Sequence, residues 1–149
     1  MRLMLVLIAA ACVLVSCGDG GSGDGDSAPR AEAVIREWAD TLRAGDVAGA
    51  AALFALPSRV SNGTEPFTLQ TRAEARAFNE SLPCGAKLLS TSSSAGFTTA
   101  VFRLTERPGP GRCGSGTGDT ARTTFVVQGG KIVEWRRVAD RPQTGGPVV

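Results

Sequence analysis

The second half of the chain holds four segments in which apolar and polar residues alternate, and these limit the fold most. They span residues 86–93, 97–105, 120–128 and 131–138. The alternation, as in Ala100 and Phe102 or in Val133 and Trp135, places every second side chain on one face of a strand. Two short glycine turns and one Gly/Pro-rich loop, residues 107–118, separate the segments. The pattern predicts an antiparallel meander with one buried face.

Helices are predicted before this meander, over residues 29–44, 47–55 and 71–82. Trp38 and Leu42 share the apolar face of the first helix. Thr71 and Glu74 form a capping box that opens the last one. A short hairpin is predicted between the second and third helices, with residues 59–61 and 67–69 as its strands around an Asn-Gly turn.

Residues 1–17 resemble the leader of a bacterial lipoprotein. Arg2 precedes an apolar run, residues 3–15, that has the length of a signal peptide core and is too short to span a bilayer as a helix. The sequence Leu14-Val15-Ser16-Cys17 resembles a lipobox. The resemblance implies cleavage before Cys17, a diacylglycerol and palmitate-type chains on that cysteine, and anchoring at the extracytoplasmic face of the cell membrane. The alternative is an ordinary secretory signal in which Cys17 has no role.

The rest of the chain divides by composition into three parts. Residues 18–30 are rich in Gly and Asp and hold no large apolar side chain, which predicts a flexible tether. Residues 31–140 are expected to form one globular domain, and residues 141–149 a disordered tail.

Charge and composition exclude several classes of function. The formal net charge of the whole chain is only +2, which argues against a nucleic-acid partner. The sequence has no His and no Tyr, so serine–histidine and cysteine–histidine catalysis are excluded and the commonest metal ligand is missing. We therefore predict no cofactor, no metal site and no catalytic residues.

Two cysteines, Cys84 and Cys113, remain if the leader is removed and Cys17 carries the lipid. Disulfides persist outside the cytoplasmic membrane, so this location predicts that the two cysteines pair. The meander permits the bond, because Cys84 precedes its first strand and Cys113 follows its second, at the same end of an antiparallel pair. Two free thiols, one of them reactive, and a zinc site are the alternatives.

Three helices followed by a four-stranded meander resemble the NTF2-like superfamily, the cystatin-like α+β cone. Residues 38–46 (WADTLRAGD) resemble its opening helix and turn, and residues 130–135 (GKIVEW) resemble its last strand. The resemblance implies an α+β fold in which three N-terminal helices pack on a curved antiparallel sheet of about four to six strands. It also implies a cone-shaped cavity, which serves isomerases, cyclases and dehydratases in some members and only binding in others. No catalytic residue is carried over, because the enzymes of the superfamily typically use Tyr, His or a cavity Asp.

Two groups of side chains are candidates for such a cavity. The aromatic candidates for an apolar lining are Trp38, Phe54, Phe67, Phe102, Phe125 and Trp135. The polar candidates are Asp40, Arg103 and Glu134, followed by Arg122 and Arg137. The alternatives are that the aromatic residues only form the core and that the charged residues lie on a solvated face of the sheet.

These observations favour a lipid-anchored, non-enzymatic domain outside the cytoplasm. It would bind a small apolar or amphipathic ligand in the cone, or a partner in the cell envelope. One alternative is a partner-docking module with a filled cavity. Another is an isomerase or dehydratase that uses a lone carboxylate, such as Asp40 or Glu134, whose pKa burial would have to raise.

Overall fold

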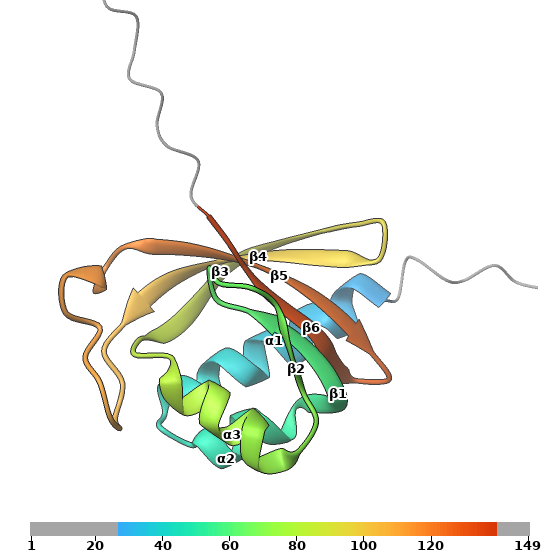
Figure 1. Cartoon of the computed structure of the whole chain (residues 1–149). Helices are drawn as coiled ribbons and strands as arrows, with labels where there is room; N and C mark the ends of the chain where they lie inside the picture. The colour runs from blue at the N-terminus through green and yellow to red at the C-terminus, as the bar shows by residue number, and fades with distance from the viewer. Residues whose placement is uncertain (1–26, 140–149) are drawn as a thin grey trace, which may run out of the picture.

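The predicted meander is present in the structure, a computed structural model that describes residues 27–139 (Figure 1). Its strands are β3 (Gly85–Ser94), β4 (Phe97–Thr105), β5 (Thr120–Gln128) and β6 (Lys131–Val138). The last three begin and end where the alternation predicted. A single turn of 3-10 helix, Gly114–Gly116, lies in the loop between β4 and β5. The leader, Cys17, the tether up to residue 26 and the tail from residue 140 lie outside the described residues.

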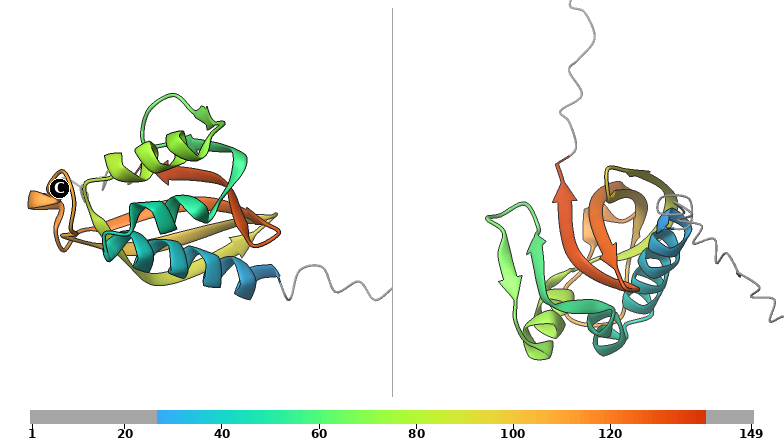
Figure 2. Two further views of the ribbon diagram at one scale, coloured as in Figure 1. Left: turned by 90° about the horizontal axis from the view of Figure 1, so that it is seen from below. Right: turned by 90° about the vertical axis from the view of Figure 1, so that its right-hand side faces the viewer.

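Three helices cover one face of a six-stranded sheet, in agreement with the expected α+β class. The remaining elements are α1 (Ser27–Arg43), α2 (Val47–Ala52), β1 (Phe54–Ser61), β2 (Phe67–Leu69) and α3 (Arg72–Ser81). We call the sheet face that the helices cover the inner face and the opposite one the outer face. Figure 2 shows that the helices all lie on the same side. No helix within residues 27–139 is long and apolar enough to cross a membrane.

The sheet is mixed, which corrects the expectation of a wholly antiparallel sheet. Its strand order is β2-β1-β6-β5-β4-β3, and β1 runs parallel to β6, with Val60 opposite Trp135. All other pairs of neighbouring strands are antiparallel. A parallel pair needs a long connection, and here every other described strand and α3 lie between β1 and β6 along the chain.

The second helix ends at Ala52, earlier than predicted, and the chain enters β1 at Phe54. Phe54 lies opposite Ile132 and is fully buried, and the Ile132 N–H donates to the Leu53 carbonyl over 2.9 Å. Pairing with the distant strand β6 therefore overrides the local helical pattern. Pro57, which has no N–H to donate, lies where the β1–β6 register shifts.

Two other boundaries follow from local chemistry. The first helix starts at Ser27, so Ser27–Arg30 belong to the helix and not to the expected tether. The predicted capping box of α3 is present: the Glu74 N–H donates to Thr71 Oγ1 over 3.2 Å, and the Thr71 N–H donates to Glu74 Oε2 over 3.0 Å.

An aromatic cluster joins α1 to the inner face. The Trp38 ring packs edge-to-face on Phe102, Phe125 and Trp135, with centroids 6.0, 5.6 and 6.1 Å away. Its Nε1 donates over 2.8 Å to Oδ1 of Asn79, which is fully buried on α3. The hydrogen bond fixes the orientation of the indole between two helices and the sheet.

One alternation prediction on β6 is wrong. Val133 was expected to share the inner face with Trp135, but Ile132 is buried instead and Val133 is only half-buried. The register of β5 and β6 shifts between Val126 and Val127, which leaves Val133 as the extra residue of a bulge. The bulge resets which side chains of β6 face the helices.

Candidate functional site

A cavity of about 180 Å³ lies between α1 and the inner face, at the end of the sheet where β3 begins and β4 ends. Its apolar walls come from α1, from the connection between α3 and β3, and from strands β3 to β6. The side chains of this wall are Trp38, Leu42, Leu82, Pro83, Cys84, Ala86, Phe102, Leu104, Ala121 and Trp135. Larger hollows, of about 620 and 490 Å³, lie along the start of α1, lined mostly by small or charged side chains. We take the smaller, mostly apolar cavity as the candidate site.

Three polar side chains also line this cavity, namely Asn62, Thr123 and Arg137. Arg137 on β6 lies opposite Thr123 on β5. Asn62 follows Ser61, which lies opposite Arg136, so β1 and β6 deliver Asn62 and Arg137 side by side. Arg137 is partly buried, and it is the single charged side chain among the residues that line the cavity.

One buried donor in the cavity wall has no hydrogen-bond partner within the described chain. Trp135 is 3% exposed, and its Nε1 makes no hydrogen bond, whereas the Nε1 of Trp38 is satisfied by Asn79. Most buried donors in proteins are paired, so an orphaned one calls for an explanation. The cavity thus combines mostly apolar walls with one cation, Arg137.

The predicted aromatic residues divide into three groups. Trp38, Phe102 and Trp135 line the cavity. Phe54 and Phe125 are fully buried in the core and do not line it. Phe67 is 48% exposed on the edge strand β2, with one side of its ring against Phe78. Half of the predicted aromatic residues therefore line the cavity.

Four of the five predicted polar residues do not enter the cavity. Asp40 is exposed on α1 and pairs with Arg43 over 2.9 Å. Arg103, Arg122 and Glu134 alternate with inward-facing residues and therefore point to the outer face. Of the charged candidates, only Arg137 lines the cavity.

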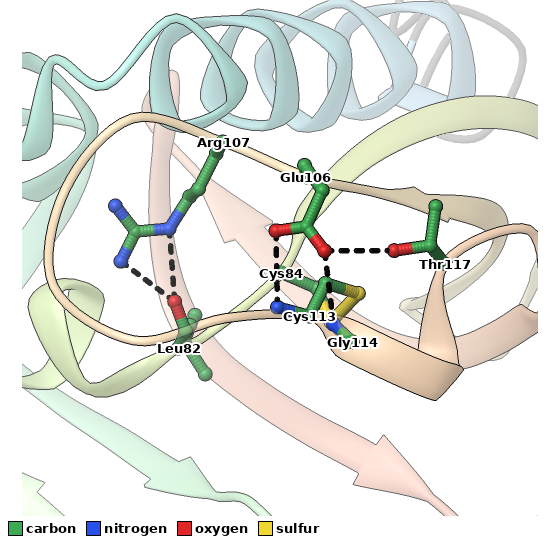
Figure 3. Close-up of a disulfide and its surroundings, with 7 residues drawn as sticks. All are labelled: Leu82, Cys84, Glu106, Arg107, Cys113, Gly114 and Thr117. Atoms are coloured by element: carbon green, nitrogen blue, oxygen red, sulfur yellow. Dashed lines mark hydrogen bonds between the residues drawn. A yellow bond between two sulfur atoms is a disulfide. The ribbon is translucent and has the colours of Figure 1, made fainter.

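The predicted disulfide is confirmed, and one of its two cysteines, Cys84, lines the cavity. Cys84 bonds to Cys113, with their Cα atoms 4.5 Å apart (Figure 3). Cys84 belongs to the connection between α3 and β3, whereas Cys113 belongs to the β4–β5 loop. The bond therefore fastens this loop beside the cavity.

The carboxylate of Glu106 organises the same loop from within. It accepts hydrogen bonds from the N–H groups of Gly114 and Cys113, over 2.9 and 3.2 Å, and from the Thr117 hydroxyl over 3.1 Å (Figure 3). These bonds, that from Gly114 first, lower the pKa of the Glu106 carboxyl below its ordinary value.

Arg107 fastens the loop to the end of α3. Its guanidinium is buried and donates to the Leu82 carbonyl from Nε over 2.9 Å and from Nη2 over 2.6 Å, and to the Glu80 carbonyl over 3.0 Å. A cation at the C-terminus of a helix is favoured by the helix dipole and by the free carbonyls there. Arg107 thus holds the start of the loop against the end of α3, and the disulfide holds its middle at Cys113.

Several cavity residues were missed by sequence reasoning. Asn62 was taken as a turn residue only, and Ala86, Ala121 and Thr123 are too small or neutral to attract attention. The alternation does contain a signal for Thr123, because it lies between Ala121 and Phe125 on the same face.

Residues 27–139 contain no cluster of His, Cys, Asp or Glu suited to a metal ion.

Comparison with known proteins shows the fold. No protein-family model and no curated protein matches the sequence. Among solved structures, a candidate ketosteroid isomerase from Kribbella flavida is 21% identical with a TM-score of 0.55, covering 80% of this chain and 86% of that one. An NTF2-like protein of unknown function from Cytophaga hutchinsonii is 8% identical with a TM-score of 0.56, covering 73% and 88%. A protein with a ketosteroid isomerase-like fold from Catenulispora acidiphila, in complex with trimethylamine, is 13% identical with a TM-score of 0.52, covering 71% and 84%. The chain has the NTF2-like fold that the resemblance predicted.

Proposed function

We propose that this chain is a lipid-anchored extracytoplasmic domain that binds a small amphipathic molecule in the inner-face cavity. The observation that carries the proposal is a largely apolar cavity whose single charged lining side chain, Arg137, is partly buried. A ligand with an anionic or strongly accepting group pairs with Arg137, while its apolar part replaces water along the walls.

The size of the cavity sets the class of ligand. Its volume of about 180 Å³ corresponds to roughly six water molecules and is below the ~300–1,000 Å³ of pockets for drug-sized compounds. The cavity therefore suits a short aliphatic or small cyclic molecule, or one end of a longer chain. A ligand as large as a fused four-ring skeleton does not fit in it.

The polar lining residues Arg137 and Asn62 indicate where the polar end of the ligand would lie. Arg137 is partly buried, so its charge is less hydrated than that of an exposed arginine. A carboxylate or phosphate ester gains a charge-assisted hydrogen bond there. We assign the ligand an anionic or strongly accepting head beside Arg137 and an apolar tail toward Leu42 and Ala86.

The contents of the cavity favour binding over catalysis. A carboxylate-based isomerase or dehydratase needs an acid that faces the substrate, and none of the cavity residues is Asp or Glu. The fold is shared with a candidate ketosteroid isomerase, but a fold by itself does not determine activity.

The anchoring part of the proposal depends on the leader. The sequence Leu14–Cys17, which resembles a lipobox, supports lipidation of Cys17. Mass spectrometry of the protein isolated from membranes tests it. We expect a mature N-terminus at Cys17 with a diacylglycerol and acyl chains, which Cys17→Ala abolishes; a mature chain without lipid contradicts it.

The binding part is tested with linear carboxylates of increasing chain length. Both tryptophans of the chain line the cavity, so intrinsic fluorescence reports on occupancy. We expect saturable binding that strengthens with chain length up to a short or medium tail and then levels off. Arg137→Gln removes the cation that the proposal places beside the ligand head and is expected to weaken binding about tenfold.

Filling the cavity provides the sharper control. Ala121→Leu adds a side chain at a buried lining position and is expected to abolish binding. Ala48→Leu makes the same chemical change at an exposed position of α2 and leaves binding unchanged. Equal binding by wild type and folded Ala121→Leu excludes this cavity as the site.

A further inference from the structure

The outer face of the sheet carries a diagonal stripe of positive charge. No described helix covers this face (Figures 1 and 2). Its cationic side chains are Arg59 on β1, Arg136 on β6, Arg122 on β5, Arg103 on β4 and Lys87 on β3. All are exposed, and each alternates with buried inner-face residues, which places it on the outer face. We call these residues the basic stripe.

The strand register sets the course of the stripe. Ser61, two residues beyond Arg59, lies opposite Arg136, and Thr124, two residues beyond Arg122, lies opposite the same Arg136. Each cation is thus the diagonal neighbour of the next one. The same step leads from Arg122 to Arg103, because Arg103 lies opposite Thr120.

The last step of the stripe is direct, since Lys87 lies opposite Arg103. Diagonal neighbours in a sheet are about 7–8 Å apart and direct ones about 5 Å, so the stripe is roughly 25–30 Å long. It crosses five strands and has the width of one residue.

Few acids neutralise this line of charge. Glu134 lies opposite Arg59, and Asp119 precedes β5 beside Thr120. Within the part of the chain that the structure describes, no salt bridge joins a stripe residue to a carboxylate. Arg103 donates from Nη1 to the Gly118 carbonyl over 3.0 Å, which holds that guanidinium against the loop.

Hydroxyl groups flank the stripe on the same face. Thr99 and Thr124 lie on adjacent strands with their Oγ1 atoms 3.4 Å apart, and Ser92 lies opposite Thr99. At the other end, Arg59 and Arg136 both line a hollow of about 260 Å³. The stripe thus begins in a depression and continues past neutral hydrogen-bonding groups.

We propose that the basic stripe binds an extended anionic polymer with phosphate or carboxylate groups along its length. Four of the five cations are arginines, which bind such groups in two-pronged fashion. A single line of cations matches a linear chain of charges better than it matches a plane of charges such as a bilayer presents. A second copy is disfavoured, because two identical stripes repel each other.

The test uses the full chain held in neutral phosphatidylcholine vesicles, with inorganic polyphosphate of defined lengths as the probe. We expect affinity to rise with polymer length until one molecule spans the stripe, and then to level off. Phosphate and triphosphate are expected to bind at least tenfold more weakly. Equal affinity for triphosphate and long polymers overturns the proposal.

Matched charge reversals locate the binding. Arg122→Glu, in the middle of the stripe, is expected to weaken polyphosphate binding at least tenfold and to reduce its salt dependence. Arg76→Glu makes the same change at an exposed position of α3 and is expected to stay within twofold. An equal loss in both variants means attraction by net charge alone, which also overturns the proposal.

A footprint separates a polymer from a membrane partner. The chain has lysines only at positions 87 and 131, and Lys131 lies at the start of β6 with its Nζ on the Ala52 carbonyl. We expect polyphosphate to slow acylation of Lys87 relative to Lys131, and phosphatidylglycerol in the vesicles without polymer to leave the ratio unchanged. Protection of Lys87 by phosphatidylglycerol alone assigns the stripe to the bilayer and rejects a polymer. Because ligand binding in the cavity is read from tryptophan fluorescence, either proposal can fail alone.

Discussion

The two faces of this sheet are built by the same strands yet have opposite chemistry. On β5, Phe125 is fully buried against Trp38 and Trp135, whereas Arg122 is exposed three residues earlier. The inner face is aromatic and borders a small cavity, and the outer face carries arginines and hydroxyls. Successive side chains of a strand point to opposite faces of the sheet. The same strands therefore supply the core and a candidate ligand cavity on one side, and a candidate binding surface on the other.

This difference predicts a strong asymmetry in stability between the faces. Phe125→Ala is expected to lower the free energy of unfolding by about 3–5 kcal/mol, because it empties a fully buried site. Arg122→Ala is expected to change it by less than about 0.5 kcal/mol. Denaturant unfolding measures both, and Phe125→Leu gives a smaller loss where the alanine variant does not fold. Similar losses at the two positions contradict the assignment of faces.

The disulfide is expected to affect the inner-face cavity and not the basic stripe on the outer face. Replacing both Cys84 and Cys113 by serine is expected to destabilise the fold by about 3–4 kcal/mol, since the bond closes a loop over a separation of 29 residues. Carboxylate binding weakens as well, because Cys84 lines the cavity. Polyphosphate binding by the folded fraction stays unchanged. Parallel loss of both binding activities shows that the two faces are coupled through the β4–β5 loop.

The two tryptophans of the inner face differ in their hydrogen bonding, and this difference predicts unequal losses of stability. Trp38→Phe leaves the Asn79 Oδ1 without its buried donor and is expected to cost about 1–3 kcal/mol more than Trp135→Phe. Trp135 donates to no described group, so the same change there removes only ring area. Thermal unfolding of the two variants tests this. Equal destabilisation indicates that the Trp135 Nε1 is satisfied in the folded protein.

The smallest predicted effect concerns pH and the loop between the faces. The folded-state pKa of Glu106 is lowered by hydrogen bonds from Gly114, Cys113 and Thr117. The ionised carboxylate therefore contributes stability above its unfolded pKa of about 4.3, and this contribution is lost as the pH falls through the lowered folded pKa. The melting temperature of Glu106→Gln is expected to lie below that of wild type at pH 7 and to approach it in acid. Glu65→Gln, at an exposed loop position, serves as the control, and a gap that persists in acid contradicts the prediction.

Sequence patterns predicted the strands whose partners are near in the chain. The bounds of β4, β5 and β6 follow from alternation and from glycine turns. The start of β1 was missed because residues 50–56 are an apolar run that fits either a helix or a buried strand. Pairing with β6, which is distant in sequence and runs parallel to β1, makes the second part of this run a strand and not a helix.

The candidate site was predicted in part for a similar reason. Large aromatic residues indicate a core or a cavity, and Trp38, Phe102 and Trp135 do line the observed cavity. Arg103 was placed in the cavity although Phe102, its neighbour, had been given the inner face, and strand geometry forbids both. Asn62 reaches the cavity only because β1 ends beside β6, and no local pattern carries that information.

The pairing of β1 with β6 also affects when the fold can form. Strand β6 lies between β1 and β5 in the sheet, yet it is the last described element of the chain. A chain that is still emerging from a ribosome or a membrane channel therefore lacks a central strand of this sheet until β6 is delivered. Contacts between such distant segments slow folding. We expect the molecule to stay open to proteases and chaperones until Trp135 arrives, and its two halves then to close in one late step.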